Sequence, residues 1–233
     1  MKANQTDWMV LLSALNCTKT NSGTIVTDGK KATAMTVDPA HVMFVKADID
    51  CTGEADRFTV DVATLLRAIA ASGGAEQEIG IDRDKGAVQV IGDSRVNVPL
   101  LDDIEQTGDL SEKFTNYVGM GKMEPARLKP LIDYAKFRKQ AKCRFINSGE
   151  NMTVRIGDNE NEMAEYVGTG GHGSGKTVCG LDYTSLIIEQ AKGAADVNVG
   201  FFSEQYSPIV FEWRAGASAR ITMILAPWIE EEE

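Results

Sequence analysis

The chain has 233 residues, of which 43% are hydrophobic and 25% are charged, and its formal net charge is −10. This length and composition fit one large or two small globular domains and exclude a disordered chain. The negative charge argues against tight nucleic-acid binding over the whole surface. No apolar run approaches the roughly 20 residues of a membrane-spanning helix, and the polar N-terminus does not resemble a signal peptide. We therefore expect a cytoplasmic protein with no membrane partner.

The first part of the chain is predicted to alternate strands with two helices. Apolar residues recur at helical spacing over residues 7–16, and Thr6 or Asp7 is available as the N-cap. A second amphipathic helix is expected over residues 61–72, and Gly73 and Gly74 end it. We expect strands at residues 24–26, 31–37, 42–45, 58–60, 78–81, 87–91 and 95–101.

Residues 102–113 are polar and acidic, lack periodicity, and are expected to form a linker. Beyond it the same order recurs. A helix is entered through Pro125, with Pro130 expected to delay its start or to kink it, and another helix begins at Asp182. We expect strands at residues 114–120, 143–146, 152–156, 162–167, 177–181, 197–202, 209–214 and 220–225.

The recurrence predicts an internal duplication, because residues 59–69 and 177–188 occupy matching places and each leads into three strands. The predicted fold is α+β, with similar domains at residues 1–101 and 114–233 joined by a connector at 102–113. Each domain is expected to be an antiparallel sheet with two helices on one face. Open sheet edges must be paired or covered, which favours assembly of subunits into a closed ring.

The cysteine and histidine spacing predicts no metal site. The four cysteines, at positions 17, 51, 143 and 179, form no C-x-x-C pair, and His41 and His172 are equally isolated. This pattern indicates reduced thiols in a cytosolic protein, and the sequence predicts no cofactor.

Basic residues concentrate between Lys122 and Arg144: this segment contains eight basic residues and two acidic ones. Such a segment indicates either a surface for a polyanion or a solvated helix face, and the sequence leaves both interpretations open.

Residues 34–49 read as two strands joined by a turn. Pro39 fixes φ, and the Asp38 side chain can bond the backbone ahead of it. His41 follows, flanked by apolar Val42 and Met43. The pattern alone favours an ordinary core hairpin.

A second motif, from Gly170 to Thr177, matches G-x-x-x-x-G-K-[ST], the signature of a phosphate-binding loop. That mechanism needs a helix to begin at the Lys-Thr pair. The residues after Lys176 are instead β-like, and helical pattern resumes at Asp182. We therefore expect a Gly-rich loop between two strands and keep a P-loop nucleotide-binding protein as an alternative.

Four separated segments together resemble the DNA sliding clamp family, the proliferating cell nuclear antigen (PCNA) of eukaryotes and archaea. They are VDPAHV at 37–42, similar to the front loop; LLDDIEQTGDL at 100–110, similar to the interdomain connector; YSPIVFEW at 206–213, similar to the penultimate strand; and ILAPWIEE at 224–231, similar to the C-terminal signature. The resemblance covers nearly the whole chain and points to an archaeal or archaeal-virus branch.

The resemblance implies a protein that is not an enzyme: a homotrimeric ring of six similar domains around double-stranded DNA. Such a ring is a processivity factor in DNA replication and repair. The implied partners are DNA polymerase, the clamp loader, flap endonuclease and DNA ligase, which dock through short peptide motifs. A subunit of a heteromeric or checkpoint-type clamp is the alternative within this class.

The resemblance also implies three sets of site residues. The implied partner-peptide-binding residues are Val37, His41, Val42, Leu110, Pro208, Ala226, Pro227 and Ile229. The implied DNA-facing residues are Arg67, Arg127, Lys136, Lys139 and Lys192. The implied subunit interface joins the edge strands at 95–100 and 162–167 through Val96, Val98, Met163 and Tyr166.

The sequence departs from the family pattern at three positions near the implied peptide site. Thr107 and Asp109 replace apolar connector residues, and Trp228 stands where a basic residue is usual. These changes concern the affinity and the choice of partner.

Overall fold

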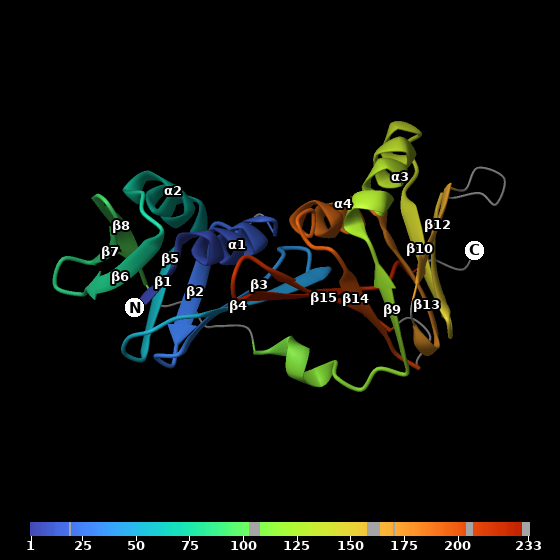
Figure 1. Cartoon of the computed structure of the whole chain (residues 1–233), viewed down its shortest axis with the longest axis horizontal. Helices are drawn as coiled ribbons and strands as arrows, with labels where there is room; N and C mark the ends of the chain where they lie inside the picture. The colour runs from blue at the N-terminus through green and yellow to red at the C-terminus, as the bar shows by residue number, and fades with distance from the viewer. Residues whose placement is uncertain (19, 103–107, 158–163, 170, 204–206, 230–233) are drawn as a thin grey trace. The chain divides into compact units, whose positions relative to one another are not determined.

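A computed structural model describes residues 1–18, 20–102, 108–157, 164–169, 171–203 and 207–229 (Figure 1). The chain divides into two units. Unit 1 comprises residues 1–110 with 214–221, and unit 2 comprises residues 111–213 with 222–233. Each unit is described by itself. No helix in the described ranges is long and apolar enough to cross a membrane.

Unit 1 is an antiparallel sheet with helices α1 and α2 side by side on one face (Figure 1). Its strands lie in the order β1–β6–β7–β8–β5–β2–β3–β4. The elements are β1 Lys2–Asn4, α1 Gln5–Asn16, β2 Ser22–Thr27, β3 Lys31–Val37, β4 Met43–Asp50, β5 Asp56–Asp61, α2 Val62–Ser72, β6 Glu76–Asp82, β7 Ala87–Ile91 and β8 Arg95–Leu101.

Unit 2 repeats this plan with α3 and α4 in contact on one face of its sheet. The strand order is β15–β14–β9–β13–β10–β11–β12. A 3-10 helix, Leu110–Lys113, precedes β9 Gly119–Met123, α3 Pro125–Phe137, β10 Lys142–Ser148, β11 Asn151–Ile156, β12 Ala164–Thr169, β13 His172–Gly180, α4 Leu181–Gln190, β14 Val197–Phe201, β15 Ile209–Ala215 and β16 Ala219–Leu225. Strands β15 and β16 contribute residues to both units.

The strand pairings confirm the internal duplication. The antiparallel pairs β1–β6, β6–β7, β5–β2, β2–β3 and β3–β4 of unit 1 recur as β9–β14, β14–β15, β13–β10, β10–β11 and β11–β12 in unit 2. The matching segments seen in the sequence are β5–α2 and β13–α4, in which a strand runs directly into a helix. The predicted α+β fold, with two helices on one face of an antiparallel sheet in each half, is confirmed.

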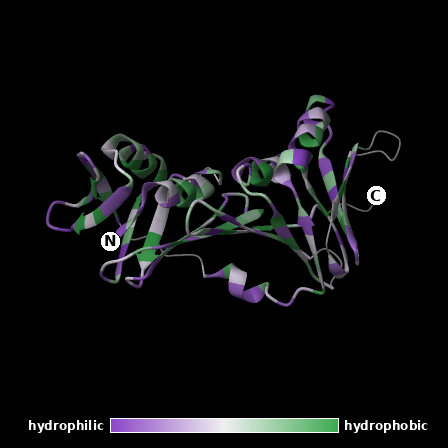
Figure 2. Ribbon diagram, viewed as in Figure 1, coloured by the Kyte–Doolittle hydropathy of each residue, from purple (hydrophilic) through white to green (hydrophobic). Residues whose placement is uncertain are grey.

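The core of each unit lies between the helices and the sheet. Apolar residues of α1, among them Trp8 and Leu11, and Leu65 and Ile69 of α2 are almost fully buried. In unit 2, Leu128, Ile132 and Ala135 of α3 are likewise almost fully buried. The hydropathy colouring shows hydrophobic and hydrophilic residues interspersed along the helices, as expected of amphipathic helices (Figure 2). The helical stripes predicted from the sequence are therefore the buried faces.

The predicted N-cap of α1 is wrong. The helix begins at Gln5, directly after β1, and the Asn4 side chain accepts a hydrogen bond of 2.8 Å from the Thr6 backbone N–H. Asp7 is buried instead, and its carboxylate accepts hydrogen bonds from the backbone N–H groups of Ala217 and Ser218 at 2.8 and 3.2 Å. Asp7 was available as a cap by residue type, but it serves a long-range contact that the local pattern does not contain.

Two expectations around β9 and α3 are also corrected. The strand expected at 114–120 is instead β9, Gly119–Met123. The Phe114 and Tyr117 rings pack on Phe202, with centroids 5.5 and 5.4 Å apart, so these aromatic residues anchor a loop and not a strand. Pro130 does not delay α3, which begins at Pro125 and continues through Pro130.

The buried thiols generate the first testable prediction. Cys143 and Cys179 face each other across β10 and β13 and are fully buried. Burial raises the pKa of both thiols above the ordinary value of 9.0 and raises the pKa of Cys17 to about 12. An aromatic disulfide reagent should therefore react with these three thiols only after denaturant unfolds the chain, as followed by absorbance.

The same shifts predict a direction for stability against pH. Below the ordinary thiol pKa of 9.0 both states keep their protons, and the stability is fully present. As the pH rises above that value, unfolded thiols ionise while buried ones do not, so the free energy of unfolding should fall. Rapid labelling of Cys17, Cys143 or Cys179 in the folded protein would contradict the first expectation, and a free energy of unfolding that stays constant as the pH rises above 9.0 would contradict the second.

Candidate functional site

The front loop between β3 and β4 is organised by the Asp38 carboxylate. Its Oδ1 accepts hydrogen bonds from the backbone N–H groups of Val42 and Met43, both at 2.6 Å, and its Oδ2 accepts one from Ala40 at 3.0 Å. The loop is closed further by the backbone bond from the Asp38 N–H to the Met43 carbonyl at 2.9 Å. The predicted side-chain bond from Asp38 to the backbone ahead of it is confirmed. Charge-assisted bonds of this length fix the loop firmly.

This geometry determines what the loop presents. His41 adopts φ +57° and is exposed, a conformation that few residues other than glycine take. Val37 and Val42, at the two ends of the turn, are half-buried, whereas Phe44 is buried in the core. The loop therefore offers two partly accessible apolar side chains beside an imidazole.

The connector reaches β4 through an ion pair that the sequence did not indicate. Lys46 Nζ lies 2.6 Å from Asp109 Oδ2, and only 22% and 18% of these side chains are exposed. Leu110, the next residue, is half-buried and begins the 3-10 helix. Asp109 thus holds the end of the segment that is predicted to form a connector. Thr107 lies outside the described residues.

The segment after β16 is held on the sheet of unit 2 by Trp228. Its backbone N–H donates to the Val178 carbonyl at 2.7 Å, and its ring lies over Gly180, where no side chain intervenes. The Lys142 ammonium lies 5.8 Å from the ring centroid, within the range of a cation–π contact. This anchoring precedes an exposed Ile229. Other predicted peptide-binding residues of unit 2, namely Pro208, Ala226 and Pro227, are half-buried.

The predicted DNA-facing cations lie on or just after helices, and several have partners. Arg127 Nη1 lies 2.8 Å from Glu124 Oε1, and this bond raises the pKa of the guanidinium. The Arg127 guanidinium also stacks over the Tyr166 ring at 5.4 Å. Exposed positions are occupied by the other four, which are Arg67 on α2, Lys136 on α3, Lys139 after α3 and Lys192 after α4.

The residues predicted for the subunit interface face inward where they are described. Val98 is 1% exposed and Val96 is half-buried. Tyr166 is 4% exposed, and its hydroxyl accepts a hydrogen bond of 2.9 Å from the Glu124 N–H. Met163 lies outside the described residues. Val98 and Tyr166 therefore pack inside their own units, and the exposed apolar side chains of these two strands are Leu101 on β8 and Val167 on β12.

The phosphate-loop motif does not build a phosphate-binding loop. Lys176 and Thr177 lie within β13, paired with Ile146 and Phe145 of β10, and the next helix begins only at Leu181. The expected Gly-rich loop is corrected as well, because His172–Gly180 is strand. Its glycines meet packing needs, since a side chain at Gly175 would clash with Phe201. The helix N-terminus that would face a phosphate is missing at Lys176.

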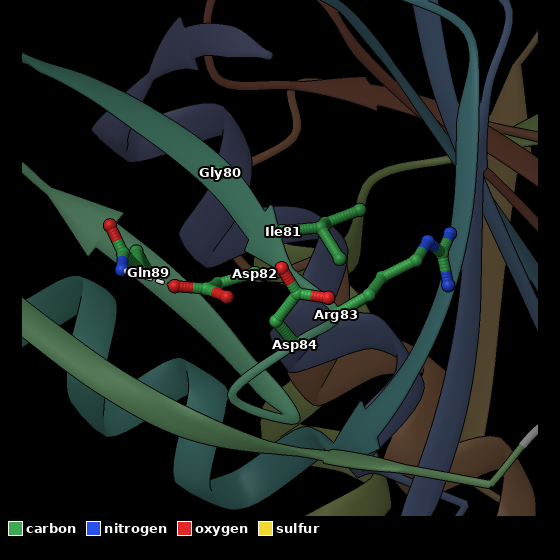
Figure 3. A pocket seen from close by; sticks show the side chains of 6 residues that line it. All are labelled: Gly80, Ile81, Asp82, Arg83, Asp84 and Gln89. Atoms are coloured by element: carbon green, nitrogen blue, oxygen red, sulfur yellow. Dashed lines mark hydrogen bonds between the residues drawn. The ribbon is translucent and has the colours of Figure 1, made fainter.

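A pocket of about 480 Å³ lies at the β6–β7 turn of unit 1 (Figure 3). Beside it, Arg83 Nη2 lies 2.6 Å from Asp56 Oδ1. The hydrogen bond from the Lys85 side chain lowers the pKa of the Asp82 carboxyl. The lining residues are Gly80, Ile81, Asp82, Arg83, Asp84 and Gln89. These polar groups contain no nucleophile paired with a base. Among the described residues no cluster of His, Cys, Asp or Glu could hold a metal ion.

Comparisons with solved structures identify the fold. No protein-family model matches the chain, and no curated protein sequence matches it. The PCNA of A. fulgidus, solved with the C-terminal region of FEN-1, superposes with a TM-score of 0.80 at 18% identity over 99% of both chains. A chain of the PCNA2–PCNA3 complex of Sulfolobus tokodaii gives 0.76 at 13% identity over 97% of this chain and 99% of that one.

The PCNA of Entamoeba histolytica gives a TM-score of 0.77 at 12% identity over 98% of both chains. Agreement over almost the full length of three such structures, together with the duplicated sheet and its paired helices, establishes the architecture. The chain has the PCNA-like sliding-clamp fold.

Proposed function

We propose that this protein is a DNA sliding clamp: a ring that encircles duplex DNA and tethers replication and repair proteins, without catalysing a reaction. The observation that carries the proposal is the superposition on the A. fulgidus PCNA over 99% of both chains. The four sequence segments that resemble the family support it independently. A clamp does its work by topological enclosure, which explains how a protein with net charge −10 can act on DNA.

The sheet edges support assembly of several copies into a ring, for which the resemblance to the PCNA family implies three. Strand β12 is the last in its sheet, and β8 pairs with β5 only at Leu100 and Leu101. Along Arg95–Pro99 the second edge of β8 carries no strand among the described residues. We propose that β8 of one copy pairs with β12 of the next through their backbone edges. Of the residues predicted for this interface, Val96 lies on β8 and is half-buried, whereas Val98 and Tyr166 support the two strands from inside their own units. Because such head-to-tail pairing is heterologous, it closes into a ring when the rotation permits.

The exposed cations on the helix faces support DNA passage along them. We assign Arg67, Arg127, Lys136, Lys139 and Lys192 to this surface. Weak contacts with phosphates carry no sequence information and let a ring slide. Arg127 is already engaged by Glu124 and Tyr166, so we expect it to contribute less than Lys139.

We further propose that short peptides of client proteins bind at the front loop, connector and C-terminal segment. The A. fulgidus structure contains the C-terminal region of FEN-1, which makes a peptide from a flap endonuclease the first candidate. DNA polymerase, DNA ligase and the clamp loader are the other expected clients. The proposed residues are Val37, His41, Val42, Leu110, Pro208, Ala226, Pro227 and Ile229. Branched and small apolar side chains suit the aromatic and aliphatic anchors of a helical turn.

The second prediction tests the ring and the peptide site together. Light scattering should give a mass of about three subunits, the number that the resemblance to the PCNA family implies, because head-to-tail pairing can close into a ring. A fluorescent C-terminal peptide of a flap endonuclease should bind, and Pro227→Glu should abolish binding because it buries a charge against apolar anchors. Ala55→Glu, which adds the same charge to an exposed loop of unit 1, is the control and should bind normally.

A monomer that ignores the peptide and binds ATP would contradict the clamp and restore nucleotide binding at Lys176. A monomer that forms a larger assembly only with a second clamp subunit would instead show a heteromeric or checkpoint-type clamp.

The third prediction concerns Asp38. Asp38→Ala leaves the N–H groups of Ala40, Val42 and Met43 without their acceptor, so the free energy of unfolding should fall by about 1–3 kcal/mol. The front loop should lose its shape, and peptide affinity should fall at least about tenfold, which corresponds to about 1.4 kcal/mol. Calorimetry of peptide binding and denaturant unfolding measure the two effects.

Asp28→Ala provides a matched control, because the Asp28 carboxylate accepts backbone bonds from Lys30 and Lys31 at 2.8 and 2.7 Å in the β2–β3 turn. This variant loses a comparable turn contact away from the proposed site. Equal loss of peptide affinity in both variants would show that the front loop has no particular role.

A further inference from the structure

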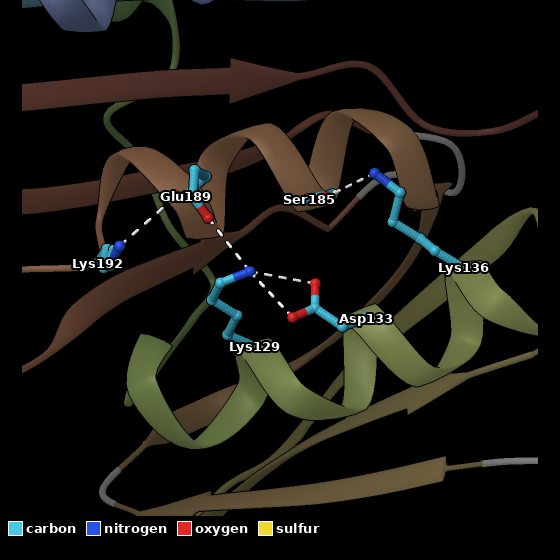
Figure 4. A network of polar contacts seen from close by, with 6 residues as sticks. All are labelled: Lys129, Asp133, Lys136, Ser185, Glu189 and Lys192. Atoms are coloured by element: carbon cyan, nitrogen blue, oxygen red, sulfur yellow. Dashed lines mark hydrogen bonds and ion pairs between the residues drawn. The ribbon is translucent and has the colours of Figure 1, made fainter.

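Helices α3 and α4 are joined by a charged network on their solvent side, which we call the helix-pair network (Figure 4). At its centre the Lys129 ammonium lies 3.1 and 3.0 Å from the two Asp133 oxygens and 3.3 Å from Glu189 Oε2. Hydrogen bonds to Asp133 and then Glu189 raise the pKa of Lys129. The complete network comprises Lys129, Asp133, Lys136, Ser185, Glu189 and Lys192.

The remaining lysines of the network are held at its two ends. Lys136 Nζ lies 3.2 Å from Ser185 Oγ, and Lys192 Nζ lies 3.9 Å from Glu189 Oε1. Three lysines on this face are thus opposed by two carboxylates. Without Asp133 and Glu189 the six residues would carry a charge of +3, and with them they carry +1.

Helix stability does not account for these two carboxylates. Glu189 lies in the last turn of α4, where the helix dipole disfavours negative charge. Asp133 follows Lys129 by four residues, the less favourable order for an ion pair on a helix. Their side chains are 56% and 51% exposed, so solvent screens their attraction to the lysines and the contribution to folding is small.

The placement has a clearer consequence for a polyanion that approaches the helices. A lysine held by two carboxylates must break those contacts before it can neutralise a phosphate. Each phosphate contact that forms releases condensed counterions and steepens the salt dependence of binding. Acidic partners on this face therefore lower both the affinity for DNA and its dependence on salt.

We propose that Asp133 and Glu189 limit how tightly the helix face of unit 2 holds DNA, by keeping Lys129 and Lys192 engaged within the protein. This inference rests on the proposed clamp function and adds two positioning residues to it. A clamp must stay linked to DNA without stopping on it, and the carboxylates reduce the number of phosphate contacts that each step along the duplex has to break.

The test compares the parent protein with Asp133→Asn/Glu189→Gln. Both changes preserve side-chain shape at exposed positions, so the fold and the subunit assembly should be retained. Affinity for a short fluorescent duplex is measured by anisotropy across a range of NaCl concentrations. Two freed lysines should make the slope of log K against log salt steeper by about 1–2, at about 0.9 per phosphate contact.

The matched control is Asp56→Asn/Asp82→Asn. It removes two half-buried carboxylates that pair with Arg83 and Lys85 in unit 1, and it changes the net charge by the same amount. Its salt slope should stay at the parent value.

Three outcomes are distinguishable. A steeper slope in the helix variant alone supports the proposal. Equal slopes in parent and helix variant, or the same change in the control, overturn it while leaving the clamp function intact. If no protein associates with the duplex at low salt, DNA contact by the helices is wrong and this inference falls, whereas the clamp function itself is decided by the mass and the peptide binding of the second prediction.

Discussion

Each half of this protein depends on burying the apolar stripe of two helices against one face of an antiparallel sheet. A sheet so covered has one wet face and edges that remain open, because helices satisfy its side chains and not its outermost backbone groups. Unit 1 places Leu65 of α2 in that core, and unit 2 places Leu128 of α3. The duplication repeats both the packing of two helices on a sheet and the unpaired sheet edge, and unpaired edges can pair with strands of another copy.

Because the inner faces of the helices are buried in the core, the charged residues of the helices lie on their outer faces and determine the electrostatic potential there. The protein is acidic overall, yet its cations gather on and near α3. Several of those cations are already neutralised, Arg127 by Glu124 and Lys129 by Asp133. Local ion pairing thus lowers the positive charge of this surface, and a count of lysines and arginines along the sequence overstates the net charge of the helix face.

The elements with strong periodicity could be predicted from the sequence, and the parts set by distant contacts could not. The stripes of α1 and α2, the paired strands and the duplication follow from local pattern. Phe114 and Tyr117 have strand propensity but pack on Phe202 as a loop. Glycines after His172 have loop propensity but are needed where β13 packs closely, as Gly175 does against Phe201.

The candidate site divides in the same way. The role of Asp38 could be predicted because its hydrogen-bond partners follow within five residues. The Lys46–Asp109 ion pair spans 63 residues, and the seat of Trp228 on Gly180 is equally non-local, so neither leaves a sequence signal. In the sequence, Asp109 and Trp228 stand out only as departures from the pattern of the family that the chain resembles.

The anchoring of Trp228 also gives the molecule an optical property. Trp8 and Trp213 are 0% and 5% exposed, whereas 41% of Trp228 faces solvent. A water-soluble quencher such as iodide reaches the third indole and is excluded from the other two. The quenchable part of the intrinsic emission thus comes from a residue next to Pro227, and its loss of access would report occupation of the C-terminal segment without any added label.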